Sequence, residues 1–144
     1  MVGKRFTVGF VAFLMLIQTV LGQTAYKPHF KGDPARSNAE ASALGYMRTV
    51  IDAQKAFKKK HTKYATSLPA LINTGSFTRR MAKTDRGDYT VTFKAPSTTH
   101  YSIQLTPKTF DAEHRGFYVE ENGVIKTEND KPATAESPML RPEA

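Results

Sequence analysis

Apolar residues at helical spacing extend from Asn38 to about His61. They recur three and four residues apart, and Gln54 lies on the same stripe. The apolar positions are Ala43, Leu44, Met47, Val50, Ile51 and Phe57. Ser37 or Asn38 can cap a helix here, and Glu40 in the first turn would complement the helix dipole. The pattern predicts one long amphipathic helix.

Beyond Gly87 the apolar period changes to two. Apolar and polar residues alternate from 89 to 94 and from 101 to 106, and a third run surrounds Asn122-Gly123, a dipeptide typical of hairpin turns. Strands are therefore expected near 88–94, 100–106, 115–120 and 124–128, with connections short enough for an antiparallel meander.

The segment between the helix and the strands has irregularly spaced apolar residues. It is expected to be a loop with one short helical turn around Pro69 to Asn73. Together these elements predict an α+β fold, in which the long helix packs on a three- to four-stranded antiparallel sheet.

The N-terminus has the features of a secretory signal. A basic start that includes Lys4 and Arg5 precedes an apolar stretch, and compact residues at Val20 and Gly22 suit cleavage before Gln23. We expect residues 1–22 to be a signal peptide and the mature chain to be secreted or periplasmic. The alternative is a membrane anchor over residues 6–26, which carry no charge and are long enough to span a bilayer.

The two flanks of the predicted domain differ in composition from its interior. Residues 23–37 contain prolines, a glycine and several charges, and are expected to form an extended lead-in. Residues 131–144 contain three prolines and are expected to form a disordered tail. The folded domain is therefore expected to cover residues 38–130.

Composition limits the chemistry that the chain can carry. It has 144 residues and no cysteine, which leaves room for one small domain and excludes disulfides, thiol catalysis and Cys-ligated metals. It also lacks the HExxH, GxSxG and P-loop motifs. We predict no enzymatic activity, no cofactor, no metal site and no small-molecule substrate.

The histidines are scattered along the chain and show no ligand spacing. They are His29, His61, His100 and His114. The densest group of acids and imidazole is Asp111, Glu113 and His114. It is interpreted as a polar turn, and weak cation binding is the alternative.

The full chain has a formal net charge of +8, and its positive charge is concentrated in the first half. The candidate anion-binding residues are Lys55, Lys58, Lys59, Lys60, Lys63, Arg79, Arg80, Lys83 and Arg86. Two interpretations stay open: a solvated face whose lysines complement the helix C-terminus, or a site for nucleic acid or an anionic polysaccharide. Any nucleic-acid binding would be salt-sensitive and weakly sequence-specific.

The stretch NAEASALGYMRTVIDAQKAFKKKHTKYATSLPAL resembles the head of type IV pilins and type II secretion pseudopilins. The later segments GDYTVTF, HYSIQLTP and GFYVEENGVIK resemble the small meander of that family, so the likeness covers about residues 38–128. The matching residues of the first stretch are Asn38, Glu40, Ala41, Ser42, Ala43, Gly45, Arg48, Thr49, Ala53, Tyr64, Ser67, Leu68 and Leu71.

The N-terminus departs from this family. Phe6 and Thr7 are similar to the start of a mature pilin, but Lys4-Arg5 precede them and no glutamate follows within the apolar stretch. The residues from Gly32 to Pro34 would also break the continuous helix that a filament core requires.

The resemblance implies a secreted, non-catalytic, pilin-like structural or interaction protein of the bacterial cell envelope or extracellular space. Its expected partner is a protein of the envelope, a type IV pilus or a secretion system. The charge pattern supports a different hypothesis, a basic binding module for an anionic polymer.

Overall fold

The computed structural model describes residue 3 and residues 25–143. The predicted signal peptide and nearly all of the alternative anchor therefore lie outside the described residues. Helix α1 spans Asn38–His61, which confirms the prediction of a long helix. Ser37 caps it with extended backbone, and the Ser37 side-chain oxygen accepts a hydrogen bond of 3.0 Å from the Glu40 amide. The helix ends at His61 and is capped by Thr62, which has a left-handed backbone and donates its N–H to the Lys58 carbonyl at 2.7 Å.

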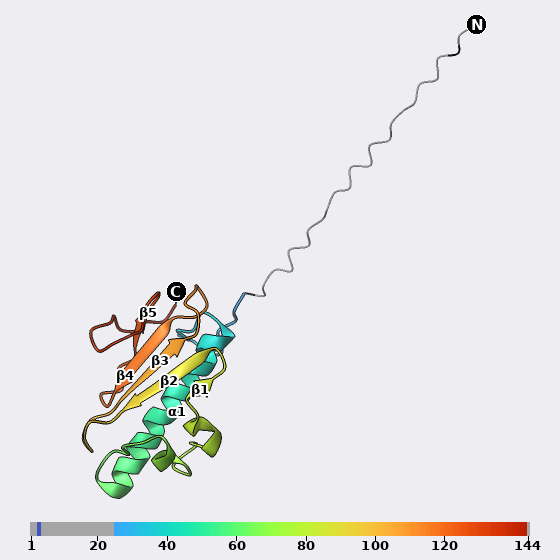
Figure 1. The fold of residues 1–144 in the computed structure, drawn as a ribbon. Helices are drawn as coiled ribbons and strands as arrows, with labels where there is room; N and C mark the ends of the chain where they lie inside the picture. The colour runs from blue at the N-terminus through green and yellow to red at the C-terminus, as the bar shows by residue number, and fades with distance from the viewer. Residues whose placement is uncertain (1–2, 4–24, 144) are drawn as a thin grey trace.

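Five consecutive strands form one antiparallel sheet in the order β1-β2-β3-β4-β5 (Figure 1). Their bounds are β1 Asp85–Arg86, β2 Tyr89–Lys94, β3 Ser102–Pro107, β4 Gly116–Glu120 and β5 Lys126–Glu128. The α+β prediction is confirmed, whereas the expected three to four strands become five. The additional strand is β1, which turns into β2 through Gly87 at a φ of 69°.

The core lies between α1 and one face of the sheet, which Figure 1 shows crossed by the helix. Leu44, Met47 and Val50 on α1 are fully buried, as is the β3 side chain of Ile103 and the β4 side chain of Phe117. Burying each such side chain stabilises the fold by about 1.5–3 kcal/mol. The periods of helix and strands therefore place their apolar residues in one shared core.

Two 3₁₀ helices follow α1 in the chain and precede the sheet. The first, η1 at Pro69–Leu71, confirms the helical turn expected in this region. The second, η2 at Arg79–Ala82, was not predicted. Leu71 and Phe77 are buried in the core and hold this segment against α1.

The lead-in is packed rather than simply extended. Asp33 accepts hydrogen bonds from the Tyr26 hydroxyl and from the amides of His29 and Ala35, and Ala35 is buried in the core. These hydrogen bonds give backbone N–H groups a partner in a segment that is too rich in proline and glycine to form a helix. The prediction of a merely extended lead-in is therefore wrong from about residue 26 onward, because this segment packs on the domain.

The C-terminal segment also packs on the domain, so the prediction of a disordered tail is wrong for residues 131–143. Ala133 is fully buried, and Leu140 packs against the core. The Leu140 amide bonds the Ile125 carbonyl at 2.8 Å, next to an isolated bridge between Lys126 and Met139. The prolines do not prevent this main-chain pairing with the sheet edge. Pro138 has no N–H to donate, but the pairing uses only its carbonyl, which accepts a hydrogen bond from the Thr127 amide.

Candidate binding surface

Five of the nine candidate cations lie at the C-terminal end of α1, and all five are exposed. This lysine cluster consists of Lys55, Lys58, Lys59, Lys60 and Lys63. Lys58 places its ammonium 4.6 Å from the centre of the Tyr64 ring, which packs edge-on against Tyr101 with 5.0 Å between ring centres. Positive charge here also complements the carbonyl end of the helix dipole.

The other four cations form an arginine cluster on η2 and the start of the sheet: Arg79, Arg80, Lys83 and Arg86. The Arg86 guanidinium lies 4.0 Å from the centre of the Tyr46 ring and donates a bond of 3.3 Å to the Arg80 carbonyl. The Tyr46 hydroxyl donates to the Met81 carbonyl at 3.0 Å. Burial raises the pKa of Tyr46 to about 12, so its phenol remains a donor at neutral pH.

The structure therefore divides the sequence-predicted patch into two groups. The arginine cluster is attached to α1 at Tyr46, and Lys58 follows about three turns later, ~18 Å along the helix axis. Among residues 25–143, no member of either cluster makes an ion pair within 4.0 Å. Both clusters therefore present charge that the described chain does not neutralise.

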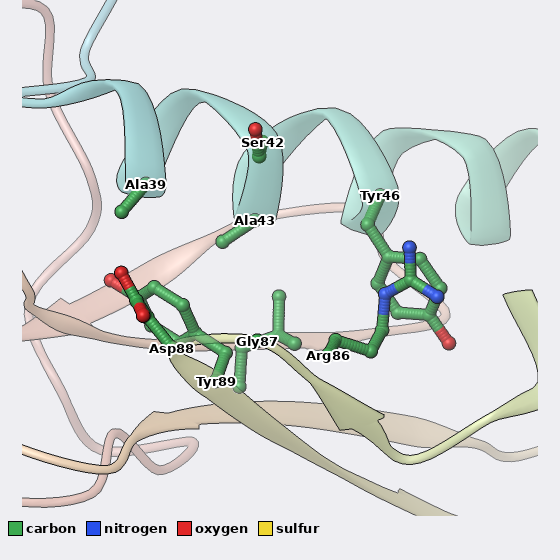
Figure 2. Close-up of a pocket in the computed structure, with 9 residues that line it drawn as sticks. Ala39, Ser42, Ala43, Tyr46, Arg86, Gly87, Asp88 and Tyr89 are labelled. Atoms are coloured by element: carbon green, nitrogen blue, oxygen red, sulfur yellow. The ribbon is translucent and has the colours of Figure 1, made fainter.

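A pocket of about 290 Å³ separates the N-terminal half of α1 from the turn between β1 and β2 (Figure 2). Figure 2 shows Ala39 and Ala43 on the helix side, with Asp88 at one end and Arg86 beside Tyr46 at the other. The remaining lining residues are Ser42, Gly87, Tyr89 and Leu105. The pocket thus has opposite charges at its two ends, and its lining is mixed polar and apolar.

The predicted polar turn is a three-residue cluster in the structure. His114 lies 2.7 Å from Asp111 through Nδ1 and 3.0 Å from Asp88 through Nε2. Partial burial alone would lower the pKa of His114, but hydrogen bonds and charges from Asp111 and Asp88 outweigh it and raise the pKa. The same contact with His114 lowers the pKa of Asp111. The cluster joins the turn before β2 to the loop before β4, and no group in residues 25–143 is placed to hold a metal ion.

A buried ion pair beside this cluster was missed by sequence reasoning. Glu40 and Arg115 lie 75 residues apart along the chain, and their side chains are 0% and 4% exposed. Glu40 accepts from the Arg115 guanidinium at 2.7 Å and from the Arg36 amide at 2.9 Å. The position of Glu40 in the first helical turn was the only available signal, because the composition of the loop does not distinguish Arg115 from an exposed arginine.

Comparison with known proteins does not assign a family to the chain. No protein-family model matches it, and no curated protein matches it significantly. Within residues 25–143, no helix has the length and hydropathy needed to cross a membrane.

Proposed function

We propose that the chain is an exported, non-catalytic, pilin-like head domain that acts as a structural or interaction protein of the bacterial envelope or extracellular space. The observation that carries the proposal is the packing of one long N-terminal helix on a consecutive antiparallel meander. This is the arrangement that the resemblance to pilins implies.

The start of α1 supports a head that works without a helical stalk. The helix begins at a capped residue, Ser37, and the preceding backbone turns away through the bonds around Asp33. Glu40 and Arg115 then fix this end of the helix to the sheet. A domain closed in this way can fold with its apolar leader removed.

The polar clusters also favour a structural role. Glu40 and Arg115 hold the helix start, while His114 joins two loops. Each of these groups has its main hydrogen-bonding partners within the chain, so its role in packing is already accounted for. A protein-binding surface is therefore a simpler use of the domain than catalysis.

Intact mass and fractionation of the protein from its native host test this proposal. A chain that starts at Gln23, found in the periplasmic or extracellular fraction, is the expected result. A chain that starts at Phe6 with a methylated amine, found in sheared filaments, would replace it with a filament subunit. A chain that retains Met1 and stays in the cytosol would overturn the proposal.

A second function is favoured by the unneutralised charge of the two basic clusters. In this alternative, the domain binds nucleic acid or an anionic polysaccharide through the lysine or the arginine cluster. Affinity for double-stranded DNA should fall with salt, and each phosphate contact should make the slope of log K against log salt more negative by about 0.9. Neutral replacements K58Q/K59Q/K60Q and R79Q/R80Q, tested separately, identify the cluster involved. Absent or salt-insensitive binding contradicts this function.

A further inference from the structure

The segment that follows α1 forms one surface with the loop between β2 and β3. The Tyr64 amide donates to the Thr98 carbonyl at 2.8 Å, and this bond joins the two segments. The next residue, Ala65, is fixed by the buried Gln54 side chain, which binds its amide at 2.8 Å and its carbonyl at 2.9 Å. Figure 1 shows the end of α1 and this loop at the same end of the domain. The lysine cluster therefore has a fixed neighbour on the sheet.

That neighbour carries three consecutive exposed hydroxyl groups. They belong to Ser97, Thr98 and Thr99, which we call the hydroxyl loop. The Ser97 and Thr99 hydroxyl oxygens lie 3.0 Å apart, and the Ser97 oxygen also accepts from the Thr99 amide at 3.3 Å. These bonds hold two hydroxyls side by side at the surface. Each hydroxyl can both donate and accept a hydrogen bond.

The aromatic rings beside the lysines are already in contact with other side chains. The Lys58 ammonium lies over the Tyr64 ring, which packs edge-on against Tyr101, and the Phe57 ring centre is 4.2 Å from that of His61. Single-stranded nucleic acid gains affinity from bases that stack on free aromatic faces. The lysine cluster also contains no arginine, the side chain that binds phosphate through two parallel hydrogen bonds. Charge is thus the main attraction that this surface offers to nucleic acid.

A polymer of acidic sugars is complementary to both parts of the surface. Its anionic groups are attracted by the five lysines, none of which forms an ion pair within 4.0 Å in residues 25–143. Its sugar hydroxyls donate and accept hydrogen bonds, as serine and threonine side chains do, whereas a phosphodiester backbone only accepts. The hydroxyl loop therefore matches a sugar better than it matches a phosphate.

We infer that the lysine cluster and the hydroxyl loop together bind an anionic polysaccharide. This inference rests on the second function proposed above, and it names both the polymer and the cluster that binds it. The lysines supply an attraction that salt screens, and the hydroxyl loop supplies hydrogen bonds that salt affects little. The arginine cluster lies ~18 Å away along the helix axis, beyond the screening length of about 8 Å at physiological salt.

Calorimetric titration with polygalacturonate and with double-stranded DNA tests the inference on the chain as produced in its native host. K59Q/K60Q should weaken polygalacturonate binding about fivefold at low salt and reduce its salt dependence. R79Q/R80Q removes the same number of charges from the arginine cluster and should weaken it less than about twofold. S97A/T99A should weaken polygalacturonate binding about fivefold at every salt concentration and leave the DNA affinity unchanged.

The control for the hydroxyl loop is S76A/T78A, an exposed serine and threonine with the same spacing before η2. Equal polygalacturonate affinities for S97A/T99A and S76A/T78A would overturn the assignment of a polysaccharide, as would an equal loss of DNA affinity in S97A/T99A. Equal losses for K59Q/K60Q and R79Q/R80Q would overturn the choice of cluster. In these outcomes anion binding itself survives, whereas the absence of salt-dependent binding to either polymer would contradict the underlying function and this inference together.

Discussion

Arg115 donates to Glu40 across 2.7 Å in a pair from which water is almost entirely excluded. The Arg115 amide also donates to Glu40 at 2.9 Å, and the Arg115 guanidinium donates to the Pro34 carbonyl at 2.8 Å. Arg115, the residue before β4, thus connects the lead-in and the first turn of α1 to the sheet. This pair stabilises the end of the domain at which the chain enters.

Replacing Arg115 should therefore strongly destabilise the folded domain. Arg115→Met leaves the Glu40 carboxylate buried without its partner, and the free energy of unfolding should fall by about 3–5 kcal/mol. The double variant Glu40→Leu/Arg115→Met removes both charges and should lose less than the single variant. Urea denaturation followed by circular dichroism measures these differences.

The matched control is Glu143→Gln, which alters the exposed end of the same network. The side chains of Arg36 and Glu143 are 39% and 42% exposed, so their pair should contribute at most about 1 kcal/mol. Equal losses for Glu143→Gln and Arg115→Met would show that burial does not determine the strength of this network.

Gln54 provides a second buried polar anchor, on the apolar stripe of α1. Its side chain is fully buried, donates to the Ala65 carbonyl at 2.9 Å and accepts from the Ala65 amide at 2.8 Å. Gln54→Leu keeps the stripe apolar but leaves both backbone groups unpaired, so we expect a loss of about 2–4 kcal/mol. The exposed replacement Lys55→Gln should change the free energy of unfolding by no more than about 0.5 kcal/mol. Unchanged amide exchange at Ala65 in Gln54→Leu would contradict this role.

The elements that the sequence predicted well are those whose signal is local. Helix α1 has the predicted bounds because its apolar spacing and its cap lie in the same 25 residues. Strands β2 and β4 lie within a residue of their expected starts because alternation marks a half-buried strand. Strand β1 has only Asp85 and Arg86, too few residues to show any alternation.

The interactions that sequence reasoning missed are formed between distant parts of the chain. Main-chain pairing of the tail with β5 has no side-chain signature, so three prolines suggested disorder. The nine cations were correctly recognised as basic, but Tyr46 and the path of η2 determine which of them are neighbours. Likewise, Asp88 joins His114 only because the meander brings two loops together.

The His114 cluster predicts a pH dependence of stability. A histidine whose pKa is raised by folding stabilises the folded state below its unfolded pKa of about 6.5, and this contribution is lost as the pH rises through the folded pKa. The pKa of Asp111 is lowered, so its charge persists well into acid. Stability should therefore decrease as the pH rises above about 6.5 and His114 becomes neutral.

His114→Gln should remove that decrease, measured as thermal unfolding at several pH values and by NMR titration of the ring. The control is His61→Gln in the last turn of α1, which leaves the cluster intact. A wild-type midpoint that is independent of pH over this range would contradict the charge pairing of His114 with Asp88 and Asp111.

Gly116 explains why the tail can cross the sheet. A side-chain carbon added there would lie 3.1 Å from the Lys131 carbonyl oxygen and 3.2 Å from the Ala133 amide nitrogen. Gly116→Val suits a strand but pushes this backbone away, so the free energy of unfolding should fall by about 1–3 kcal/mol. The Leu140 amide should also exchange faster with solvent. Gly45→Ala, where nothing lies within 4 Å of the added carbon, should instead stabilise α1 by about 0.5–1 kcal/mol. Slow Leu140 exchange in Gly116→Val would mean that the tail is held without its crossing at Gly116.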